Sequence, residues 1–261
     1  MTMWTALGRA VAATLLVLCA ATARAEPADP CAVPGYLLFG ESLLQRVGAT
    51  ATNEKALKIV VLGGSSASLP GPDGVSFAFP ARLEVALRRR LPNLKVSVAT
   101  DIRFRQTAEQ MVDDIEKLVT DQKPNLVIWQ TGTYDALHGI DPEEFRSAVS
   151  EGVEKLQSAG VDVVLMNMQY SPRTDSVVAL TAYVDAIRWV AREREVPVYD
   201  RLAIMRHWYD AGQFDLYAAT KDMKMAKSVH DCIGRTLAAS IIDAARLEPQ
   251  EEKSQEGTSP R

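Results

Sequence analysis

Short apolar runs alternate with longer segments of helical periodicity from Lys58 almost to Arg246. The apolar runs carry Val, Ile or Leu at neighbouring positions, which is typical of strands buried under helices on both faces of a sheet. The predicted strands are Ile59–Leu62, Val96–Thr100, Asn125–Trp129, Asp162–Asn167 and Val196–Tyr199. The predicted helices are Phe79–Arg90, Thr107–Thr120, Pro142–Ala159, Val177–Arg194 and Ala226–Arg246. The pattern therefore predicts an α/β fold, a three-layer α/β/α sandwich with a mostly parallel sheet of about five strands.

Two segments between these elements carry local signals. Asp141 followed by Pro142 predicts a helix start, because Asp caps a helix N-terminus and Pro fits its first position. Ser68–Ser76 is rich in Pro and Gly, which predicts an exposed loop. That loop either shapes a substrate mouth or is an ordinary connection between a strand and a helix.

The two ends of the chain differ from its middle in composition. Arg9, an apolar run over residues 10–21 and the small residues around Ala25 predict a secretory signal peptide cleaved after Ala25. Localisation is therefore expected to be periplasmic or secreted. Residues 26–54 form an N-terminal segment, 55–246 the folded domain and 247–261 a polar tail that is expected to be disordered.

Charge narrows the choice of partners. Cleavage after Ala25 removes Arg9 and Arg24 and no acidic residue, so the formal net charge changes from −4 to −6. This acidic balance gives no general attraction to nucleic acid or to an anionic membrane, and we expect neither a nucleic-acid partner nor a membrane span after cleavage. The basic triplet Arg88–Arg90 is expected at a helix C-terminus, where cations interact favourably with the helix dipole.

Only Cys31 and Cys232 remain once the signal peptide is removed. An oxidising compartment would allow them to pair, and the bridge would attach the N-terminal segment to the last helix. The alternative is two unrelated buried thiols. Their spacing does not suggest a metal site, and the chain has no Gly-rich phosphate loop, so no cofactor is expected.

The candidate for chemistry is the end of the first predicted strand. The apolar run there leads into Gly63-Gly64, which allows the backbone to turn sharply, and Ser65 follows. In open α/β sheets, ligands bind beyond the carboxyl ends of the strands, so Ser65 would face the binding crevice as a nucleophile. The alternative is a small-residue turn without catalytic function.

Two blocks in the same order resemble one family. Gly63-Gly64-Ser65-Ser66-Ala67 is similar to the first block of the SGNH/GDSL hydrolases of the secreted bacterial type, and Gly132-Thr133-Tyr134-Asp135 is similar to their Gly-x-Asn block. The resemblance covers roughly residues 55–245. It implies a flavodoxin-like sheet and hydrolysis of a carboxylic ester, such as an O-acyl group on a carbohydrate or lipid.

The resemblance also implies donors for the oxyanion of the reaction. In the family they are the backbone N–H of the serine, the N–H of a glycine after the second strand, and an asparagine side chain after the third. This chain has no glycine after its second strand, so Ile102 or Arg103 would present that N–H. The third block retains Gly132 but has Tyr134 at the asparagine position, and the phenol reaches farther from the backbone than an amide does.

The base of the family lies in an Asp-x-x-His motif before the last helix, and two alignments are open here. The first takes His230 as the base, with Lys227 three residues earlier at the aspartate position. The second aligns Cys232-Ile-Gly-Arg-Thr-Leu-Ala238 with the last helix of secreted members. It places Lys224 at the histidine position and Lys221 at the aspartate position. We favour the second alignment because it matches more positions.

A serine–lysine pair is conceivable only if burial removes the proton from Lys224, since protonated lysine is no base. His138, three residues after Asp135 on a loop expected to face the site, is a further candidate base. His207 is expected to pack or to cap a helix.

The sequence thus supports three functions. The first is a degenerate family member with Ser65 retained and with weak or no hydrolase activity. The second is an active esterase, acting on a small acylated substrate, that uses Ser65 with His230 or Lys224. The third is a binding or helper protein for a partner in the cell envelope.

Overall fold

The computed structural model describes residues 29–40, 42–217 and 223–249. The predicted signal peptide and nearly all of the predicted polar tail lie outside these ranges. Lys221 lies outside them as well.

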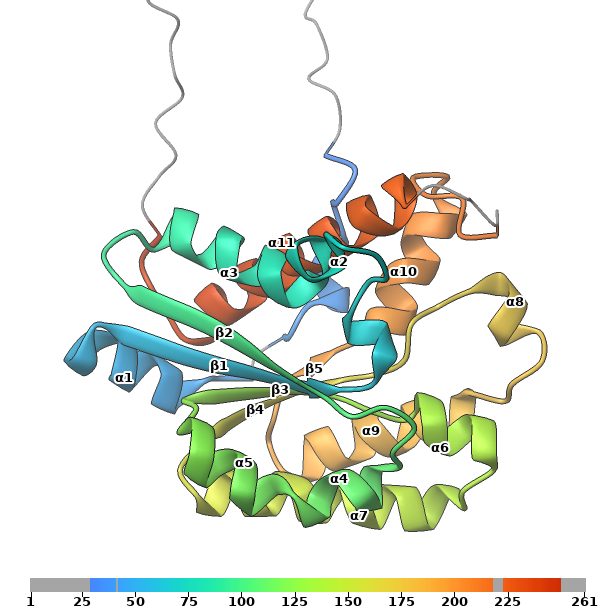
Figure 1. The fold of residues 1–261 in the computed structure, drawn as a ribbon, viewed down its shortest axis with the longest axis horizontal. Coiled ribbons are helices and arrows are strands. Elements are labelled where there is room, and N and C mark those ends of the chain that lie inside the picture. The colour runs from blue at the N-terminus through green and yellow to red at the C-terminus, as the bar shows by residue number, and fades with distance from the viewer. Residues whose placement is uncertain (1–28, 41, 218–222, 250–261) are drawn as a thin grey trace, which may run out of the picture.

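Five parallel strands form the sheet at the centre of the molecule (Figure 1). They are β1 (Ala56–Gly63), β2 (Lys95–Ile102), β3 (Leu126–Gln130), β4 (Asp162–Met166) and β5 (Val198–Tyr199). β1, β3 and β4 are almost entirely buried, because helices cover both of their faces. The predicted α/β fold with about five strands is therefore confirmed, and the sheet is wholly parallel.

The strand order is β2-β1-β3-β4-β5, so the chain reverses its direction of progress across the sheet between β1 and β3. Leu62 in β1 lies opposite Trp129 in β3, and each strand ends one residue beyond this pair. The carboxyl ends of β1 and β3 therefore form the topological switch point, where sheets of this order bind ligands. The serine block follows β1 and the Gly132 block follows β3.

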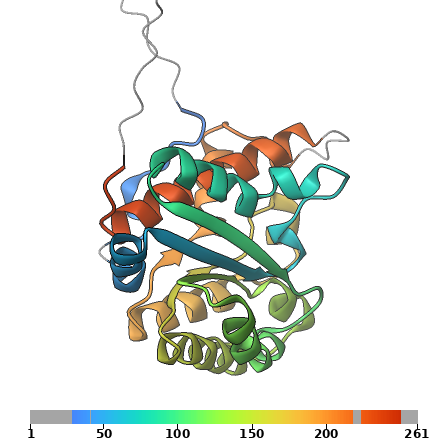
Figure 2. The same ribbon diagram turned by 60° about the vertical axis from the view of Figure 1, so that its left-hand side comes forward.

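Helices cover the sheet in two layers (Figures 1 and 2). One face carries α3 and α11, with α2 and α10 on the same side, and the other carries α4, α5, α7 and α9. The short helices α6 and α8 follow β3 and β4, and α1 contacts β1 and β4, with the N–H of Val47 donating to Asp162 at the start of β4. The bounds are α1 Gln45–Glu54, α2 Gly74–Phe77, α3 Phe79–Arg90, α4 Ala108–Asp113, α5 Ile115–Gln122, α6 Thr133–His138, α7 Pro142–Ser158, α8 Pro172–Asp175, α9 Thr181–Glu193, α10 Arg201–Asp210 and α11 Lys224–Ala244, with 3₁₀ turns at Gly35–Leu37 and Ser65–Ala67.

The helices begin and end where local chemistry dictates. Asp141 accepts hydrogen bonds from the N–H groups of Glu143 and Glu144, and Pro142 is the first residue of α7, as predicted. Thr107 and Gln110 form a reciprocal capping box at the start of α4.

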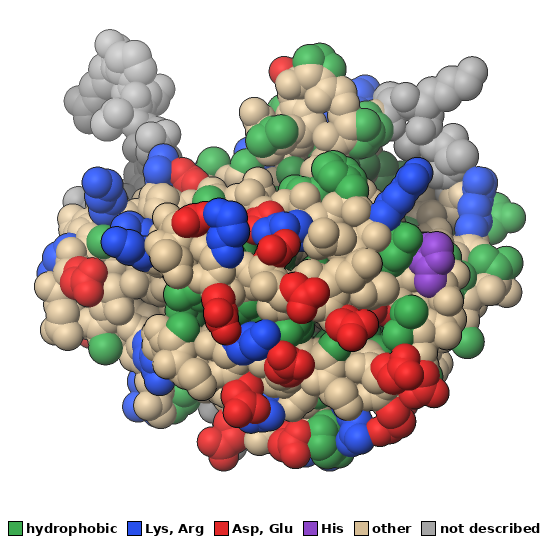
Figure 3. Space-filling model, turned by 60° about the horizontal axis from the view of Figure 1, so that its bottom comes forward, with side chains coloured by type: hydrophobic (Ala, Val, Ile, Leu, Met, Phe, Trp, Pro, Cys, Tyr) green, Lys and Arg blue, Asp and Glu red, His purple; other side chains and the backbone are tan. Residues whose placement is uncertain are grey.

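The outer surface of the layer that contains α4 and α7 shows intermingled acidic and basic side chains (Figure 3).

Two predicted helices and one predicted loop differ from the observed elements. The predicted helix over residues 107–120 is two helices, because the chain leaves the helical path at Asp114 between α4 and α5. The predicted helix over residues 177–194 begins only at Thr181. The predicted loop Ser68–Ser76 contains the start of the short helix α2.

Cys31 and Cys232 form a disulfide, which joins the N-terminal segment to α11. An ion pair between Asp29 and Arg235, and a hydrogen bond from Trp208 Nε1 to the carbonyl of Ala32, hold the same segment. Within the described ranges, no helix has the length and apolar character needed to cross a membrane.

Candidate functional site

Ser65 lies at the switch point, on the 3₁₀ turn that directly follows β1 and Gly64. Its side chain is exposed. The turn is tight because the N–H of Ala67 donates to the carbonyl of Gly64 and that of Ser68 to the carbonyl of Ser65. The position that the sequence assigned to the nucleophile therefore faces the crevice.

Two hollows meet at this turn, and Ser65, Ser66 and Gln169 line both of them. The first, which we call the His230 hollow, has a volume of about 400 Å³ and is also lined by Arg201, Met205, Met225, Val229 and His230. The second, which we call the Tyr134 hollow, has a volume of about 340 Å³ and is also lined by Arg103, Gly132, Tyr134 and His138. Both volumes are in the range of small-molecule sites, about 300–1,000 Å³.

The hydroxyl of Ser65 makes no hydrogen bond with any described residue, and neither does its backbone N–H. A nucleophilic serine needs a base within hydrogen-bond reach to take its proton. The described part of the chain places no such base there. The free N–H is nevertheless suited to donate to a ligand oxygen.

His230 lies in the wall of the hollow that carries its name, on α11, and is only 5% exposed. Its Nδ1 accepts a hydrogen bond of 2.9 Å from the backbone N–H of Phe79. Burial, with a contribution from the charge of Arg201, lowers the pKa of His230 to about 3. The imidazole is therefore neutral at pH 7 and too weakly basic to hold a proton taken from Ser65.

The other candidate bases, Lys224 and His138, form no hydrogen bond with Ser65 among the described contacts. Lys224 is the exposed first residue of α11 and lines neither hollow. His138 is exposed at the end of α6, and its ring packs on Tyr134 with 4.0 Å between the ring centroids. His138 shares the Tyr134 hollow with Ser65 without a hydrogen bond between them. The assignment of a base to His230, Lys224 or His138 stays a prediction.

The turn after β2 offers little to an oxyanion. The N–H of Arg103 donates to the carbonyl of Gly63 at 2.7 Å and so belongs to the sheet. Donors alternate between the two sides of a strand, and β2 is the edge strand, so the N–H of Ile102 points away from β1 and from the serine turn. The oxyanion role that the resemblance implies for Ile102 stays a prediction. Arg105 adopts a positive φ of 58°, a conformation that glycine favours.

Gly132 and Tyr134 begin α6 beside the serine turn. Gly132 has a φ of 96°, and a Cβ built on it would lie 2.7 Å from Sδ of Met168. Its side-chain position is thus closed by packing, and only glycine fits. Tyr134 contributes to the lining of the Tyr134 hollow. The substrate-binding roles predicted for Gly132 and Tyr134 stay predictions.

Asp135, the next residue of that block, is buried, and its Oδ1 accepts a hydrogen bond of 2.8 Å from the N–H of Ala108 at the start of α4. Burial raises the pKa of this carboxyl. Asp135 therefore ties α6 to α4, and it also contributes to the lining of the Tyr134 hollow.

A polar network that the sequence reasoning missed lies on the other side of the turn. Gln130 Nε2 donates to Ser66 Oγ at 2.6 Å. Nη1 of Arg201 lies 3.2 Å from the carbonyl oxygen of Ser66 and 3.4 Å from its Oγ, and Nη2 lies 3.4 Å from Oε1 of Gln169. Gln130, Gln169 and Arg201 each follow the end of a predicted strand by one or two residues. Their place at the carboxyl edge of the sheet is the sequence signal that could have identified them as site residues.

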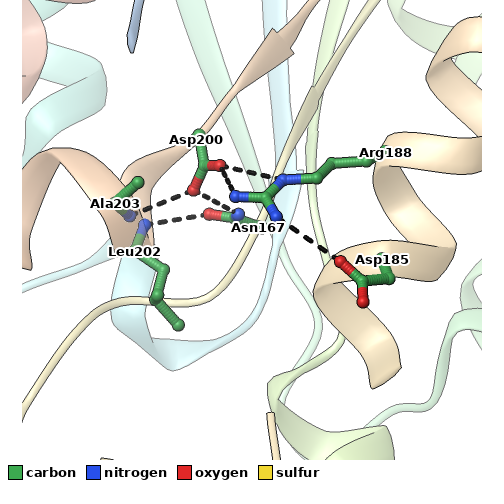
Figure 4. Close-up of polar contacts among 6 residues, drawn as sticks. All are labelled: Asn167, Asp185, Arg188, Asp200, Leu202 and Ala203. Carbon is green, nitrogen blue, oxygen red and sulfur yellow. Dashed lines mark hydrogen bonds and ion pairs between the residues drawn. The ribbon is translucent and has the colours of Figure 1, made fainter. Parts of the chain in front are cut away.

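Arg201 is the first residue of α10, and a second network fixes the start of that helix (Figure 4). Asn167, which is fully buried, donates to Asp200 Oδ1 at 2.7 Å and accepts from the N–H of Leu202 at 3.0 Å. Asp200 also accepts from the N–H of Ala203 and pairs with Arg188 at 2.5 Å. Asp200, the carboxylate next to Arg201 in the chain, therefore binds Asn167, Ala203 and Arg188 and forms no ion pair with Arg201.

This geometry, a serine at the switch point of a parallel β2-β1-β3-β4-β5 sheet, is that of an SGNH/GDSL-type hydrolase fold. Residues 30–247 match the model of the Non-GDSL lipase-like family, and the chain belongs to that family. No curated protein matches the chain.

Similar solved structures agree with this assignment. TesA is 16% identical, with a TM-score of 0.57 over 72% of this chain and 99% of TesA. A protein from Desulfitobacterium hafniense assigned to the G-D-S-L family is 20% identical, with a TM-score of 0.53 over 70% of this chain and 98% of its own. A variant of Axe2, an acetylxylan esterase from Geobacillus stearothermophilus, is 16% identical, with a TM-score of 0.58 over 71% and 94% of the two chains. At these identities the likeness shows the fold, and the predicted family and fold are confirmed.

Proposed function

We propose that the protein binds a small acyl-bearing ligand at Ser65 and hydrolyses esters weakly or not at all. The observation that carries this proposal is the missing base: the Ser65 hydroxyl has no hydrogen-bond partner among the described residues, and the histidine in its hollow has a pKa of about 3. Without proton removal, a serine hydroxyl is a poor nucleophile at neutral pH.

The features that bind a ligand are present even so. Ser65 is exposed between two hollows, and its backbone N–H is available to a carbonyl oxygen. Slow acyl transfer would proceed by attack of Ser65 Oγ on the carbonyl carbon, with the hydroxyl proton passing to water and the Ser65 N–H stabilising the oxyanion. The ester C–O bond then breaks, the leaving alkoxide takes a proton from water, and a second water hydrolyses the acyl-serine to the carboxylic acid and free Ser65. A single backbone donor stabilises that oxyanion less well than a full set of donors does.

The test is labelling of the protein with a fluorophosphonate probe, together with hydrolysis of p-nitrophenyl acetate. We expect both rates in the parent protein to lie within about tenfold of those in Ser65→Ala, because no positioned base contributes its usual 10²–10⁴-fold. Ser176→Ala, which removes another exposed serine hydroxyl, is the matched control. A rate that depends on Ser65 by a hundredfold or more would overturn the proposal.

The second candidate is an active esterase, and the exposed, unbonded hydroxyl of Ser65 is the observation that favours it. The acetylxylan esterase activity named for Axe2 makes acetyl esters the first substrates to test. If Ser65-dependent turnover is found, His230→Asn, Lys224→Met and His138→Gln would identify the base by the variant that loses it.

Secretion and an envelope partner belong to the proposal as well. Export is supported by the apolar N-terminal run and the small residues around Ala25. A protein isolated from the producing cell should begin at Glu26, and a mass spectrum of the intact chain decides it. An unprocessed N-terminus would contradict export by this route.

A further inference from the structure

Arg201 is the most completely buried charged side chain described near the site. It is 0% exposed, and no described carboxylate forms an ion pair with it. Burying a guanidinium without a counter-charge is costly, because the lost hydration is not replaced. Burial lowers the pKa of Arg201 to about 10, so the group still carries its proton at neutral pH.

The hydrogen bonds of this guanidinium are long and incomplete. Its three contacts measure 3.2–3.4 Å, whereas bonds from a charged nitrogen to a carboxylate are normally about 2.7–2.9 Å. Its Nε has no hydrogen-bond partner among the described residues. The group therefore retains donor capacity that the protein itself does not use, and it lines the His230 hollow.

Among the partners of the guanidinium, Gln169 is the one whose side chain is exposed. Its side chain is exposed, lines both hollows and offers only a neutral amide oxygen to Nη2, at 3.4 Å. An exposed glutamine side chain held by one weak bond can rotate away at little cost, because it regains rotamer freedom and hydration. A ligand oxygen can then take the place of Gln169 Oε1.

The remaining lining indicates which anion fits. Met205, Leu216, Met225 and Val229 supply apolar wall, and His230 is uncharged at neutral pH. Arg201 is the one Lys or Arg side chain in the described lining of this hollow, so its single positive charge matches a monoanion better than a dianion such as phosphate. A monoanionic, planar carboxylate on an aliphatic body matches both the single guanidinium and the apolar wall.

We propose that the His230 hollow binds a monocarboxylate with a short aliphatic chain, whose carboxylate displaces Gln169 and pairs with Arg201. This inference deepens the proposed function by naming the ligand chemistry, and it holds whether or not Ser65 reacts. The network of Asn167 and Asp200 positions Arg201 by fixing the first turn of α10 (Figure 4).

The test is calorimetric titration of the folded protein with sodium hexanoate at pH 7, beside hexan-1-ol and inorganic phosphate. We expect hexanoate to bind at least tenfold more tightly than either of the other two. Arg201→Met should weaken hexanoate binding at least tenfold. Arg206→Met, on the same helix but paired with Asp175 and outside both hollows, should change it less than twofold.

Gln169→Glu is the decisive variant because it keeps Arg201 and replaces an exposed side chain with one of nearly the same size and shape. The new carboxylate would pair with Arg201 within the chain and should weaken hexanoate binding at least tenfold. Unchanged binding in Gln169→Glu, equal binding of hexan-1-ol, tighter binding of phosphate, or no binding of hexanoate to the parent protein would each overturn the inference. Labelling and ester hydrolysis report on Ser65, whereas hexanoate titration of Arg201→Met and Gln169→Glu reports on Arg201, so failure of the proposed function and failure of this inference give different results.

Discussion

His230 illustrates how one buried side chain serves folding in a position that the sequence suggested for catalysis. Its Nδ1 accepts the backbone N–H of Phe79, the first residue of α3, and so joins α11 to the start of α3. A buried N–H left without an acceptor costs about 1–3 kcal/mol. The imidazole must stay neutral to accept this bond, which agrees with its lowered pKa.

The lowered pKa makes the stability of the protein depend on pH. The pKa of His230 is about 3 when folded and about 6.5 in the reference state, so the unfolded chain binds the proton more readily between these values. The stabilisation is fully present above pH 6.5 and is lost as pH falls toward 3, with a slope approaching about 1.4 kcal/mol per pH unit. Urea unfolding of the parent protein and of His230→Asn, whose amide oxygen can still accept from Phe79, measures this slope.

The difference between the two proteins isolates His230, because other groups such as Asp135 titrate in both. We expect the stability of the parent protein to fall more steeply between pH 6 and pH 4 than that of His230→Asn. His138→Gln, which removes an exposed histidine, should follow the parent protein. Identical slopes in the parent protein and His230→Asn would show that the imidazole does not resist protonation.

The sequence predicted the place of the site better than its residues. Ser65 lies at the switch point as expected, because a strand that ends in Gly63-Gly64 fixes where the backbone turns. Arg201 was missed because its role depends on its burial and on the fact that its neighbour Asp200 pairs with Arg188 instead. Neither property can be read from the local sequence. Which side chain could act as the base also depends on packing. The sequence alone therefore left two alignments open, one with His230 and one with Lys224.

At the scale of elements, α3 and α11 approach each other closely at Gly234. A Cβ built on Gly234 would lie 2.6 Å from Cβ of Arg82 and 2.7 Å from the backbone nitrogen of Leu83. An ion pair between Arg82 and Asp231 bridges the same helices. The two helices therefore depend on the absence of a side chain at this position.

We expect Gly234→Ala to destabilise the protein by about 1–3 kcal/mol, because overpacking against backbone forces the helices apart. Helix propensity alone would act in the opposite direction, favouring Ala over Gly by about 1 kcal/mol. The sign of the change in the free energy of unfolding by urea therefore decides which effect dominates. Ser228→Ala, at an exposed position of α11, serves as the control and should be neutral or slightly stabilising.

Elements with strong apolar periodicity were predicted well, and weakly patterned ones were not. The observed bounds of α3 equal the predicted Phe79–Arg90, since its buried face repeats at helical spacing. α1 was missed because only Val47 and Ala51 of its ten residues are buried. α6 was read as a loop because it is six residues long and lies between two glycines with positive φ. Such short helices depend on tertiary contacts more than on pattern.

At the scale of the whole molecule, the disulfide between Cys31 and Cys232 connects residues separated by 201 positions. It closes almost the entire folded domain into one loop and holds the segment before α1 against α11. In the chain-entropy model, a cross-link over so long a loop restricts the unfolded state strongly, which stabilises the folded state. Pairing also agrees with the export that the N-terminal run predicts.

Removal of this cross-link should lower the free energy of unfolding by about 2–5 kcal/mol. The measurement is urea unfolding of the mature protein with and without a reducing agent, beside a double variant with Cys31→Ser and Cys232→Ser. The reduced parent protein and the double variant should unfold at similar urea concentrations, and reductant should not affect the variant. Thiol titration of the unreduced, denatured protein should find no free thiol in a chain that begins at Glu26, whereas retention of Cys19 would add one. Two free thiols, with unfolding that does not respond to reductant, would refute the cross-link, and the N-terminal segment would then be held by noncovalent contacts such as the Asp29–Arg235 ion pair and the Trp208 hydrogen bond.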